Sequence, residues 1–173
     1  MNLIITCPRH FETEASDEIS VILEEMGEES PKIEKSSLSG ILMIDAKVDP
    51  VQVSHKIREK IQDEPWAIRY ILRTIPIQKW ILTDLDKILL ESQELSKKIQ
   101  DDQKYRITIE KRNSEISSQE IITKVADNVK RNVSLDNPDW IILIEIFGKY
   151  TGLSLIEKDD ILSVEKEKRA ISE

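Results

Sequence analysis

The first half of the chain alternates between short apolar runs and segments with apolar residues every three or four positions. Leu3 to Thr6 is a run typical of a buried strand, whereas residues 12–26 place apolar side chains on one helical face. Asp49 followed by Pro50 indicates a helix start, because Asp caps the first turn and Pro fits within it. The pattern predicts strands at residues 3–6, 31–34, 41–45 and 68–75, and helices at residues 12–26 and from residue 50.

This order of elements, strand-helix-strand-strand-helix-strand, is that of a ferredoxin-like sandwich. We therefore predict an α+β chain whose first 76 residues form an N-terminal ferredoxin-like domain. Many unrelated activities occur on that fold, so it fixes no function by itself.

The second half has a different order of elements. Residues 77–83 predict a connector, with Trp80 as a packing anchor, and Thr83 three residues before Asp86 resembles a helix-capping box. Residues 104–110 alternate strictly between apolar and polar side chains, which predicts a strand. The remaining pattern predicts a helix from residue 84, a helix at 115–131, a strand at 140–147, a tight turn at Gly148-Lys149 and a returning strand at 153–156.

These elements predict four segments. A ferredoxin-like domain covers residues 1–76, a connector covers 77–83, and a second α/β domain covers 84–157. The charged residues 158–173 are typical of a frayed C-terminal tail.

Composition supports a folded protein, with 39% hydrophobic and 34% charged residues among 173. No apolar stretch approaches the roughly 20 residues of a membrane span, and the first residues lack the basic and apolar regions of a secretory signal. We therefore expect a cytoplasmic protein that does not associate with a membrane.

The net charge of −8 argues against a nucleic-acid partner, because phosphate binding depends on Lys and Arg. The charge is unevenly distributed, however. Residues 1–46 hold 3 basic and 10 acidic groups, a balance of −7, whereas residues 97–150 hold 10 basic and 9 acidic groups, a balance of +1. A local positive face therefore remains possible in the second half.

Several kinds of catalytic site are missing. The four glycines form no phosphate-binding loop, and no G-x-S-x-G, HExxH or CxxC motif occurs. A single cysteine, Cys7, excludes a multi-cysteine zinc site. We expect no catalytic activity, no cofactor and no metal, although scattered carboxylates leave an enzyme of another class open.

The strongest candidates for RNA contact lie along the predicted strand and at its exit: Lys104, Arg106, Lys111, Arg112 and Asn113. Donors at a strand exit could bind a backbone phosphate or a 2′-hydroxyl group. The competing interpretation is an ordinary solvated face of a sheet.

Further candidates lie on the predicted helix 115–131. Residues four and seven positions apart share one outer stripe of a helix. The stripe and its neighbour comprise Lys124, Asn128, Lys130 and Arg131, and we expect them to join the strand residues in one footprint.

In the first domain, Arg69 and Arg73 share a face of the predicted strand, because they are an even number of residues apart. A packed arginine is nearly as good an interpretation of this pair as an RNA contact.

The ordered segments YRITIEKRN, EIITKVADNV and VSLDNPDWIILIEIFGKYTGLSL resemble the core of a THUMP domain, an RNA-binding module of tRNA-modifying proteins. The resemblance covers residues 84–157 and depends on the ordered combination, since no single short motif is diagnostic. It implies that Lys111, Arg112 and Asn113 lie where the family has a basic strand exit.

Most THUMP enzymes carry a separate catalytic domain, for which we expect no room in a chain of this length. The chain therefore resembles the stand-alone Tan-type adaptor, which assists an acetyltransferase that modifies a cytidine in tRNA. The resemblance implies that this protein holds the acceptor end of tRNA while a separate enzyme, using acetyl-CoA and ATP, acts on the D-arm. Neither cofactor would then bind to this chain.

Two alternatives stay open. The first is a protein-interaction or assembly module whose acidic first domain docks a partner without RNA contact. The second is an RNA-binding subunit of another tRNA-modifying enzyme, for thiolation, methylation or pseudouridylation. For the adaptor, we expect Lys111→Ala with Arg112→Ala to weaken tRNA binding without changing thermal stability.

Overall fold

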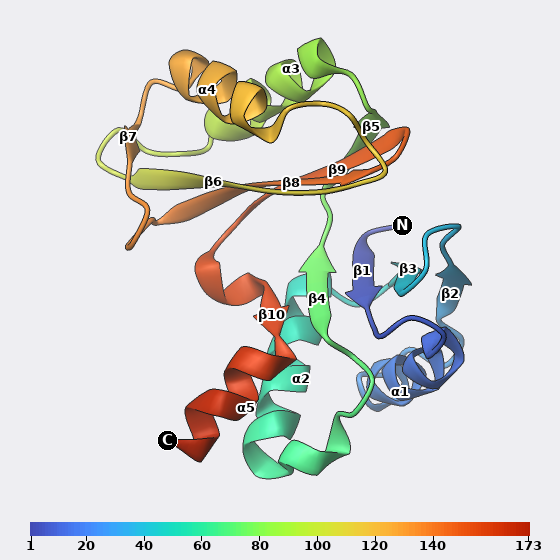
Figure 1. The fold of residues 1–173 in the computed structure, drawn as a ribbon. Helices are drawn as coiled ribbons and strands as arrows, with labels where there is room; N and C mark the ends of the chain where they lie inside the picture. The colour runs from blue at the N-terminus through green and yellow to red at the C-terminus, as the bar shows by residue number, and fades with distance from the viewer. The chain divides into compact units, whose positions relative to one another are not determined.

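The computed structural model describes residues 1–173 and divides them into two compact units. The first unit comprises Met1–Ile77 with Asp159–Glu173, and the second comprises Gln78–Lys158. Each unit is built on its own five-stranded sheet with helices packed on it (Figure 1). The predicted mixture of α and β structure is confirmed.

The sheet of the first unit is antiparallel throughout, in the order β10-β4-β1-β3-β2. The chain order strand-helix-strand-strand-helix-strand is present, and the C-terminal segment adds one more strand and helix. The elements are β1 (Leu3–Thr6), α1 (Glu12–Glu25), β2 (Lys32–Lys35), β3 (Ile41–Asp45), α2 (Pro50–Asp63), the 3₁₀ helix η1 (Pro65–Ala67), β4 (Arg73–Pro76), β10 (Leu162–Ser163) and α5 (Val164–Ser172).

Helices α1 and α2 bury their apolar faces against one face of this sheet. Ile19 and Ile57, one from each helix, are fully buried with Leu3 and Leu42 of the strands. The Asp49 carboxylate accepts the backbone N–H of Val51 and caps α2 as predicted. Burial of each large apolar side chain in this core stabilises the unit by about 1.5–3 kcal/mol.

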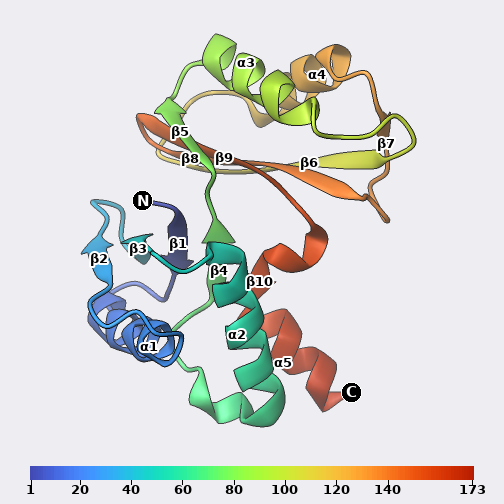
Figure 2. The same cartoon turned by 180° about the vertical axis from the view of Figure 1, so that it is seen from behind.

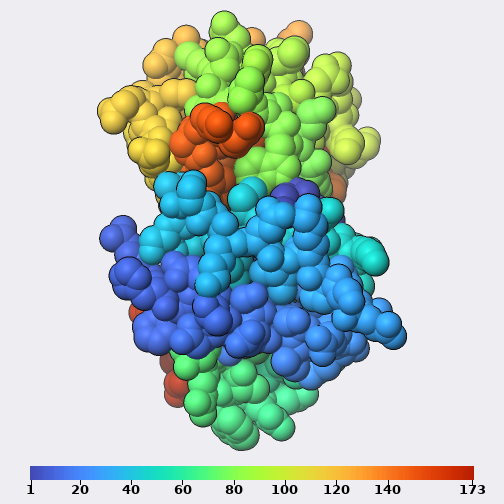
Figure 3. Space-filling model, turned by 90° about the vertical axis from the view of Figure 1, so that its right-hand side faces the viewer, coloured from blue at the N-terminus to red at the C-terminus, as the bar shows by residue number.

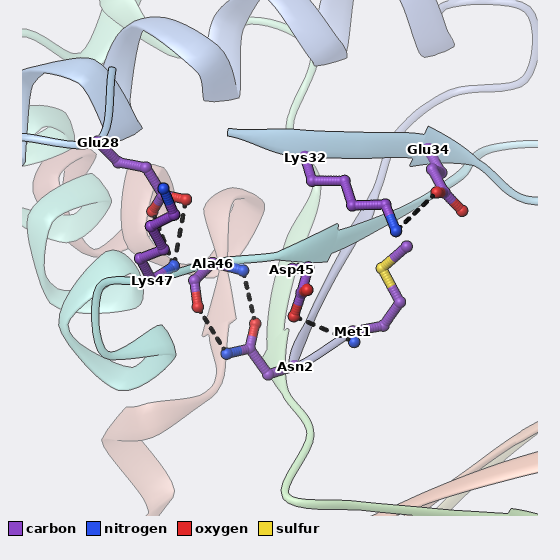
Figure 4. Close-up of polar contacts among 8 residues, drawn as sticks. All are labelled: Met1, Asn2, Glu28, Lys32, Glu34, Asp45, Ala46 and Lys47. Carbon is purple, nitrogen blue, oxygen red and sulfur yellow. Dashed lines mark hydrogen bonds and ion pairs between the residues drawn. The ribbon is translucent and has the colours of Figure 1, made fainter. Parts of the chain in front are cut away.

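Side chains also fasten the ends of the strands (Figure 4). The Asn2 amide donates to the Ala46 carbonyl at 2.8 Å and its oxygen accepts the Ala46 N–H at 2.9 Å. The buried carboxylate of Glu28 accepts the backbone N–H of Lys47. Backbone groups beyond the ladder thus gain partners from side chains.

The strand predicted at 68–75 is shorter than expected, because β4 begins only at Arg73. In the preceding segment the Glu18 carboxylate accepts three successive backbone N–H groups, from residues 69, 70 and 71, at 2.6–3.0 Å. A side chain of α1 therefore takes the donors that a sheet ladder would use. The buried Ile68 and Ile71 produce the apolar pattern that resembled a strand.

The C-terminal segment differs from the predicted frayed tail. Leu162 pairs with Thr74 of β4 and is fully buried in the core of the first unit. In α5, Glu167 forms an ion pair with Arg58 at 2.9 Å, and Lys168 donates to the Ile68 carbonyl. The charges that predicted a frayed end belong to the outer face of a packed amphipathic helix.

The second unit has the sheet order β5-β9-β8-β6-β7, with helices α3 and α4 on one face (Figures 1 and 2). Strand β6 is parallel to β7 and β8, whereas the β8–β9 and β5–β9 pairs are antiparallel. The elements are β5 (Lys79–Leu82), α3 (Leu85–Ser96), β6 (Lys104–Arg112), α4 (Ser118–Asn128), β7 (Asn132–Val133), β8 (Trp140–Phe147) and β9 (Tyr150–Ile156), followed by the 3₁₀ helix η2 (Lys158–Asp160) at the boundary between the units.

The predicted connector is part of this sheet, because its residues 79–82 form β5 and pair with β9. Trp80 lies against Phe147, with ring centroids 5.8 Å apart. Asp84, rather than Thr83, caps α3, and the Thr83 hydroxyl bonds that of Thr151 at 2.8 Å. Four residues that looked like a linker were therefore an edge strand.

Helix α4 begins at Ser118, three residues later than predicted, because Ser117 caps it by accepting the N–H of Glu120. It ends at Asn128, earlier than the predicted residue 131. None of the α-helices combines the length and the apolar character needed to cross a membrane.

The packing of Leu162 gives a direct test of the C-terminal segment. We expect Leu162→Ala to lower the free energy of unfolding by about 2–4 kcal/mol, because a fully buried side chain leaves a cavity. Urea unfolding followed by circular dichroism measures this value. Ile171→Ala, at a position 44% exposed in the same segment, is the control and should change stability by less than about 0.5 kcal/mol. Equal stability of the two variants would show that the segment is frayed.

Candidate nucleic-acid interface

Most side chains of strand β6 alternate between an apolar and a basic face of the sheet, although Lys111 has the parity of the apolar residues. Tyr105, Ile107 and Ile109 belong to the core beneath α3 and α4. Arg106 and Arg112 have the opposite parity and therefore lie on the other face. The predicted alternation of this strand is confirmed, although the basic positions have different surroundings at its two ends.

At the start of β6, the Arg106 side chain and the Lys104 backbone hold the loop before β8. The Arg106 guanidinium donates to the Leu135 carbonyl at 3.0 Å. The Asp139 carboxylate accepts the backbone N–H of Lys104 at 2.7 Å, and the Lys104 side chain is exposed. Arg106 thus supports the loop, while Lys104 is open to solvent.

The C-terminal ends of α3 and α4 enclose a hollow of about 280 Å³. We call it the basic hollow; its charged and amide lining consists of Gln93, Glu94, Lys97, Asn128, Lys130 and Arg131. Three of these side chains are cationic and one is anionic, which leaves a balance of +2. The structure thus brings three predicted residues together and adds Lys97, which sequence reasoning missed because it lies on a different helix.

Arg131 lines the basic hollow and binds the backbone next to it. Its guanidinium donates to the carbonyls of Ile99 and Lys130 and pairs with Asp101 at 3.0 Å. Both carbonyls lie beyond the helices, because α3 ends at Ser96 and α4 at Asn128, so the guanidinium fastens the segments that follow the two helices. Arg131 therefore has a structural role, which leaves Lys97 and Lys130 as the exposed cations of the hollow.

Two residues of the predicted helix stripe are used locally. Lys124 forms an exposed ion pair with Glu120 at 3.1 Å, and the Asn128 amide donates to the Lys124 carbonyl at 2.7 Å. Lys97 is likewise paired with Glu94. Exposed pairs of this kind contribute roughly 0–1 kcal/mol, so a phosphate can replace the carboxylate at little cost.

The strand exit is built differently from the prediction. The Arg112 guanidinium pairs at 3.0 Å with Glu145, whose side chain is fully buried, and lies 5.0 Å from the Phe147 ring centroid. The Lys111 ammonium donates to the Ile116 carbonyl at 2.9 Å. Both cations were predicted to be available for a phosphate, and both have partners within the unit.

Asn113 ends the strand with a backbone φ of 54°, in the left-handed region that Asn tolerates better than most residues. The exposed Lys149 lies nearby in the β8–β9 turn, 5.3 Å from the ring centroid of Tyr150, which is 47% exposed. The charged hairpin tip was visible in the sequence, but its neighbours were not. We call Lys111, Arg112, Asn113 and Lys149 the strand-exit cluster.

The basic hollow and the strand-exit cluster lie at opposite ends of β6. Asn132 pairs with Lys104 at the start of the strand, whereas Gly148 donates to the Arg112 carbonyl at its end. Eight residue steps of about 3.3 Å separate the two ends by roughly 26 Å. The single footprint expected from the sequence is therefore divided into two groups within the second unit.

The two arginines of the first unit are not on one strand. Arg69 is exposed in the irregular segment whose backbone Glu18 holds, whereas the half-buried Arg73 is the first residue of β4. The shared face predicted for them depended on a continuous strand from 68 to 75, which does not form.

The chain offers few reactive groups elsewhere. No three His, Cys, Asp or Glu side chains are grouped to hold a metal ion. Burial raises the pKa of the Cys7 thiol to about 11, with smaller contributions from Glu12 and Glu14. That thiol stays protonated at neutral pH and is a poor nucleophile.

The family model of the THUMP domain matches residues 83–156. The chain therefore contains a THUMP domain, as the ordered segments predicted, and it coincides with the second unit apart from β5 and a few flanking residues. An uncharacterized protein of Methanocaldococcus jannaschii, MJ0421, is 28% identical over 116 residues, which are 64% of this chain and 32% of that protein.

Several solved structures share the fold. PH1313 from Pyrococcus horikoshii has a TM-score of 0.61 at 19% identity, over 91% of this chain and 55% of that one. TrmN from Thermus thermophilus reaches 0.55 at 13% identity, over 88% and 44%. A 4-thiouridine synthetase in complex with RNA and ATP also reaches 0.55 at 13%, over 94% and 42%. The chain thus spans about a third to a half of the length of these proteins.

The Arg112–Glu145 pair changes the expectation for mutants of the strand exit. We expect Arg112→Ala to lower the free energy of unfolding by about 3 kcal/mol, because it removes a partner of a fully buried carboxylate. Thermal or urea unfolding measures the loss. Adding Glu145→Gln to Arg112→Ala should restore part of it, since the buried charge is then gone. Lys104→Ala, at an exposed cation of the same strand, is the control; an equally small effect at both positions would contradict the structural role of the pair.

Proposed function

We propose that this protein, which contains a THUMP domain at residues 83–156, is a tRNA-binding adaptor that presents tRNA to a modifying enzyme. The observation that carries the proposal is the family match itself, because the THUMP domain is an RNA-binding module of tRNA-modifying proteins. The likeness in fold to TrmN and to an RNA-bound 4-thiouridine synthetase also supports a tRNA-binding role.

In the finer form of this proposal the modifying enzyme is a tRNA cytidine acetyltransferase that forms N-acetylcytidine. The second unit holds the acceptor end of the tRNA, while acetyl-CoA and ATP bind to the separate enzyme. Support comes from the resemblance to the stand-alone Tan-type adaptor. In this proposal residues 1–173 bind and position the RNA and perform no chemistry on it.

The basic hollow is the surface of the second unit best suited to the RNA backbone. Its balance of +2 and its exposed Lys97 and Lys130 provide charge that can follow a phosphate. Lysine is a flexible point charge, so it binds phosphate without demanding one fixed geometry. Contacts of this kind position RNA by its backbone and carry no base sequence. The strand-exit cluster adds Lys149 and Asn113 as a second group of donors.

A second candidate is an RNA-binding subunit for another modification, such as methylation or thiolation. It is favoured by the solved structures with this fold, which include TrmN and the 4-thiouridine synthetase. The two candidates share tRNA binding and differ in the nucleotide that is changed.

Salt and lysine removal test RNA binding by the basic hollow. With about four phosphate contacts, we expect affinity for a tRNA transcript to fall about a hundredfold between 50 and 200 mM salt. Lys97→Ala with Lys130→Ala should weaken binding about tenfold and reduce the slope of log Kd against log salt by about two. Fluorescence anisotropy measures both quantities.

The matched control removes the same charge from the same unit. Lys79 and Lys87 are exposed, and Lys87 lies at the other end of α3 from Lys97. Lys79→Ala with Lys87→Ala should bind tRNA nearly as well as the unchanged protein. Equal losses in both double variants would show that only overall charge matters, and absence of tRNA binding at low salt would refute the adaptor.

Nucleoside analysis separates the two candidates. We expect tRNA from cells that lack this protein to lose N-acetylcytidine, as measured by mass spectrometry of digested tRNA. Restoring the unchanged gene should return the nucleoside, whereas the Lys97→Ala and Lys130→Ala variant should return less of it. Loss of a methylated or thiolated nucleoside instead would favour the second candidate, and an unchanged nucleoside profile would contradict both.

A further inference from the structure

We propose that the first unit carries a docking site for a positively charged, amphipathic segment of a protein partner. The site is the surface between α1 and the segment 66–70, and we call it the acidic groove. It involves no residue of the THUMP domain, so this proposal goes beyond tRNA binding.

The acidic groove is a defined hollow. A volume of about 190 Å³ is lined by Glu18, Val21, Ile22, Lys60, Ala67 and Ile68. Its two walls are tied together, because the Glu18 carboxylate accepts three backbone N–H groups from residues 69–71. In Figure 3 the blue surface of the N-terminal segment borders the green surface of this segment. The hollow is therefore held open by hydrogen bonds and does not depend on a mobile loop.

One exposed apolar side chain lines this groove, and others lie in the segments that flank it. Val21 on its α1 wall is 53% exposed, and Trp66, next to the lining residue Ala67, is 66% exposed. Beyond Glu18, Phe11 is 43% exposed and stacks on Tyr70 with ring centroids 5.5 Å apart. Large exposed aromatic surface of this kind is enriched at protein interfaces.

Carboxylates surround Val21 on every side along its helix. The positions three and four residues before and after it are its helical neighbours, and they hold Asp17, Glu18, Glu24 and Glu25. Helix α1 carries six carboxylates in all and no Lys or Arg. An exposed apolar residue is thus set within a ring of negative charge.

This arrangement works against the stability of α1. Like charges three or four residues apart repel each other, and carboxylates in a last turn oppose the helix dipole. Only Glu25 has a cationic partner, Lys60 at 2.8 Å, and that pair neutralises the one cation lining the groove. Glu18 is held by backbone donors instead. Among the neighbours of Val21, Asp17 and Glu24 have no cationic partner inside the unit, and charges that lower stability in this way point to a partner outside it.

The charge of the groove selects the occupant. Phosphates of RNA would be repelled by the ring of carboxylates, and a second copy of α1 would bring two acidic surfaces together. A segment with Lys or Arg flanking an apolar anchor fits both features, because the anchor fills the hollow and the cations face the carboxylates. The partner is therefore a protein with a basic amphipathic segment.

The test uses the full chain and defined synthetic peptides in the absence of RNA. The probe is a fluorescent Lys/Leu amphipathic helix of about five turns, roughly 18 residues. A scrambled peptide of the same composition and a Glu/Leu peptide are the controls. We expect saturable one-to-one binding of the amphipathic Lys/Leu peptide, much weaker binding of the scrambled one and none of the acidic one.

Two variants of the groove locate the binding. Trp66→Ala should weaken binding of the Lys/Leu peptide at least tenfold, as expected for an exposed aromatic side chain beside the hollow. Asp17→Asn with Glu24→Gln keeps the apolar surface. This double variant should weaken binding of the Lys/Leu peptide about fivefold at low salt and less at high salt. Leu90→Ala, at a residue 57% exposed in the second unit, should leave binding unchanged. The charge variant keeps the test decisive if Trp66→Ala fails to fold.

Several results would overturn the proposal. These are absence of binding, equal affinity for the scrambled or acidic peptide, and indifference to both groove variants. Self-association of the unchanged protein that Trp66→Ala abolishes, measured by sedimentation, would assign the groove to a second copy. A loss of tRNA affinity in Trp66→Ala without loss of peptide binding would assign it to RNA. Since the peptide assay contains no tRNA, its outcome is independent of the outcome for the THUMP domain.

Discussion

The parallel pairing of β6 with β8 is the constraint on which the second unit depends. Two parallel neighbours need a crossover, and the chain makes it with α4, which returns over the sheet from the end of β6 towards its start. The same step places the ends of α3 and α4 beside Lys104, while the β8–β9 turn comes back to Arg112. The separation of the basic hollow from the strand-exit cluster follows from this topology. An RNA that contacts both must extend over roughly 26 Å.

Some cationic side chains of the second unit stabilise its fold, whereas others are exposed and available for binding. The guanidinium groups of Arg112 and Arg131 each pair with a carboxylate, and Arg131 also donates to the backbone carbonyls of Ile99 and Lys130. Lys97, Lys130 and Lys149 are exposed. Arginine forms fixed multidentate contacts, whereas lysine keeps a flexible point charge, so the division matches the chemistry of the two side chains. The lysines are therefore the groups available for binding, whereas the arginines stabilise the structure around them.

The carboxylates of the first unit also divide into those that stabilise the fold and those that are exposed. Glu18 and Glu28 replace missing backbone partners, and both are therefore structural. Asp17 and Glu24 have no such task and surround an exposed valine. The concentration of acidity in residues 1–46 thus contains a structural part and a part that we assign to a partner. The basic hollow of the second unit and the carboxylates of α1 in the first unit are opposite in charge, which suits the one surface to RNA and the other to a protein.

The sequence by itself determined the elements whose signals are local. The capping Asp49, the alternation of β6 and the ordered THUMP segments were sufficient to identify α2, the central strand and the domain at 83–156. Tertiary structure alone decided the elements whose partners are distant in the chain. Strand β5 exists because β9 lies beside it, residues 69–71 are irregular because Glu18 takes their N–H groups, and Leu162 is buried because β4 offers an edge. The same holds for the site, since neither the buried partner of Arg112 nor the meeting of Lys97 with Lys130 follows from spacing along one chain segment.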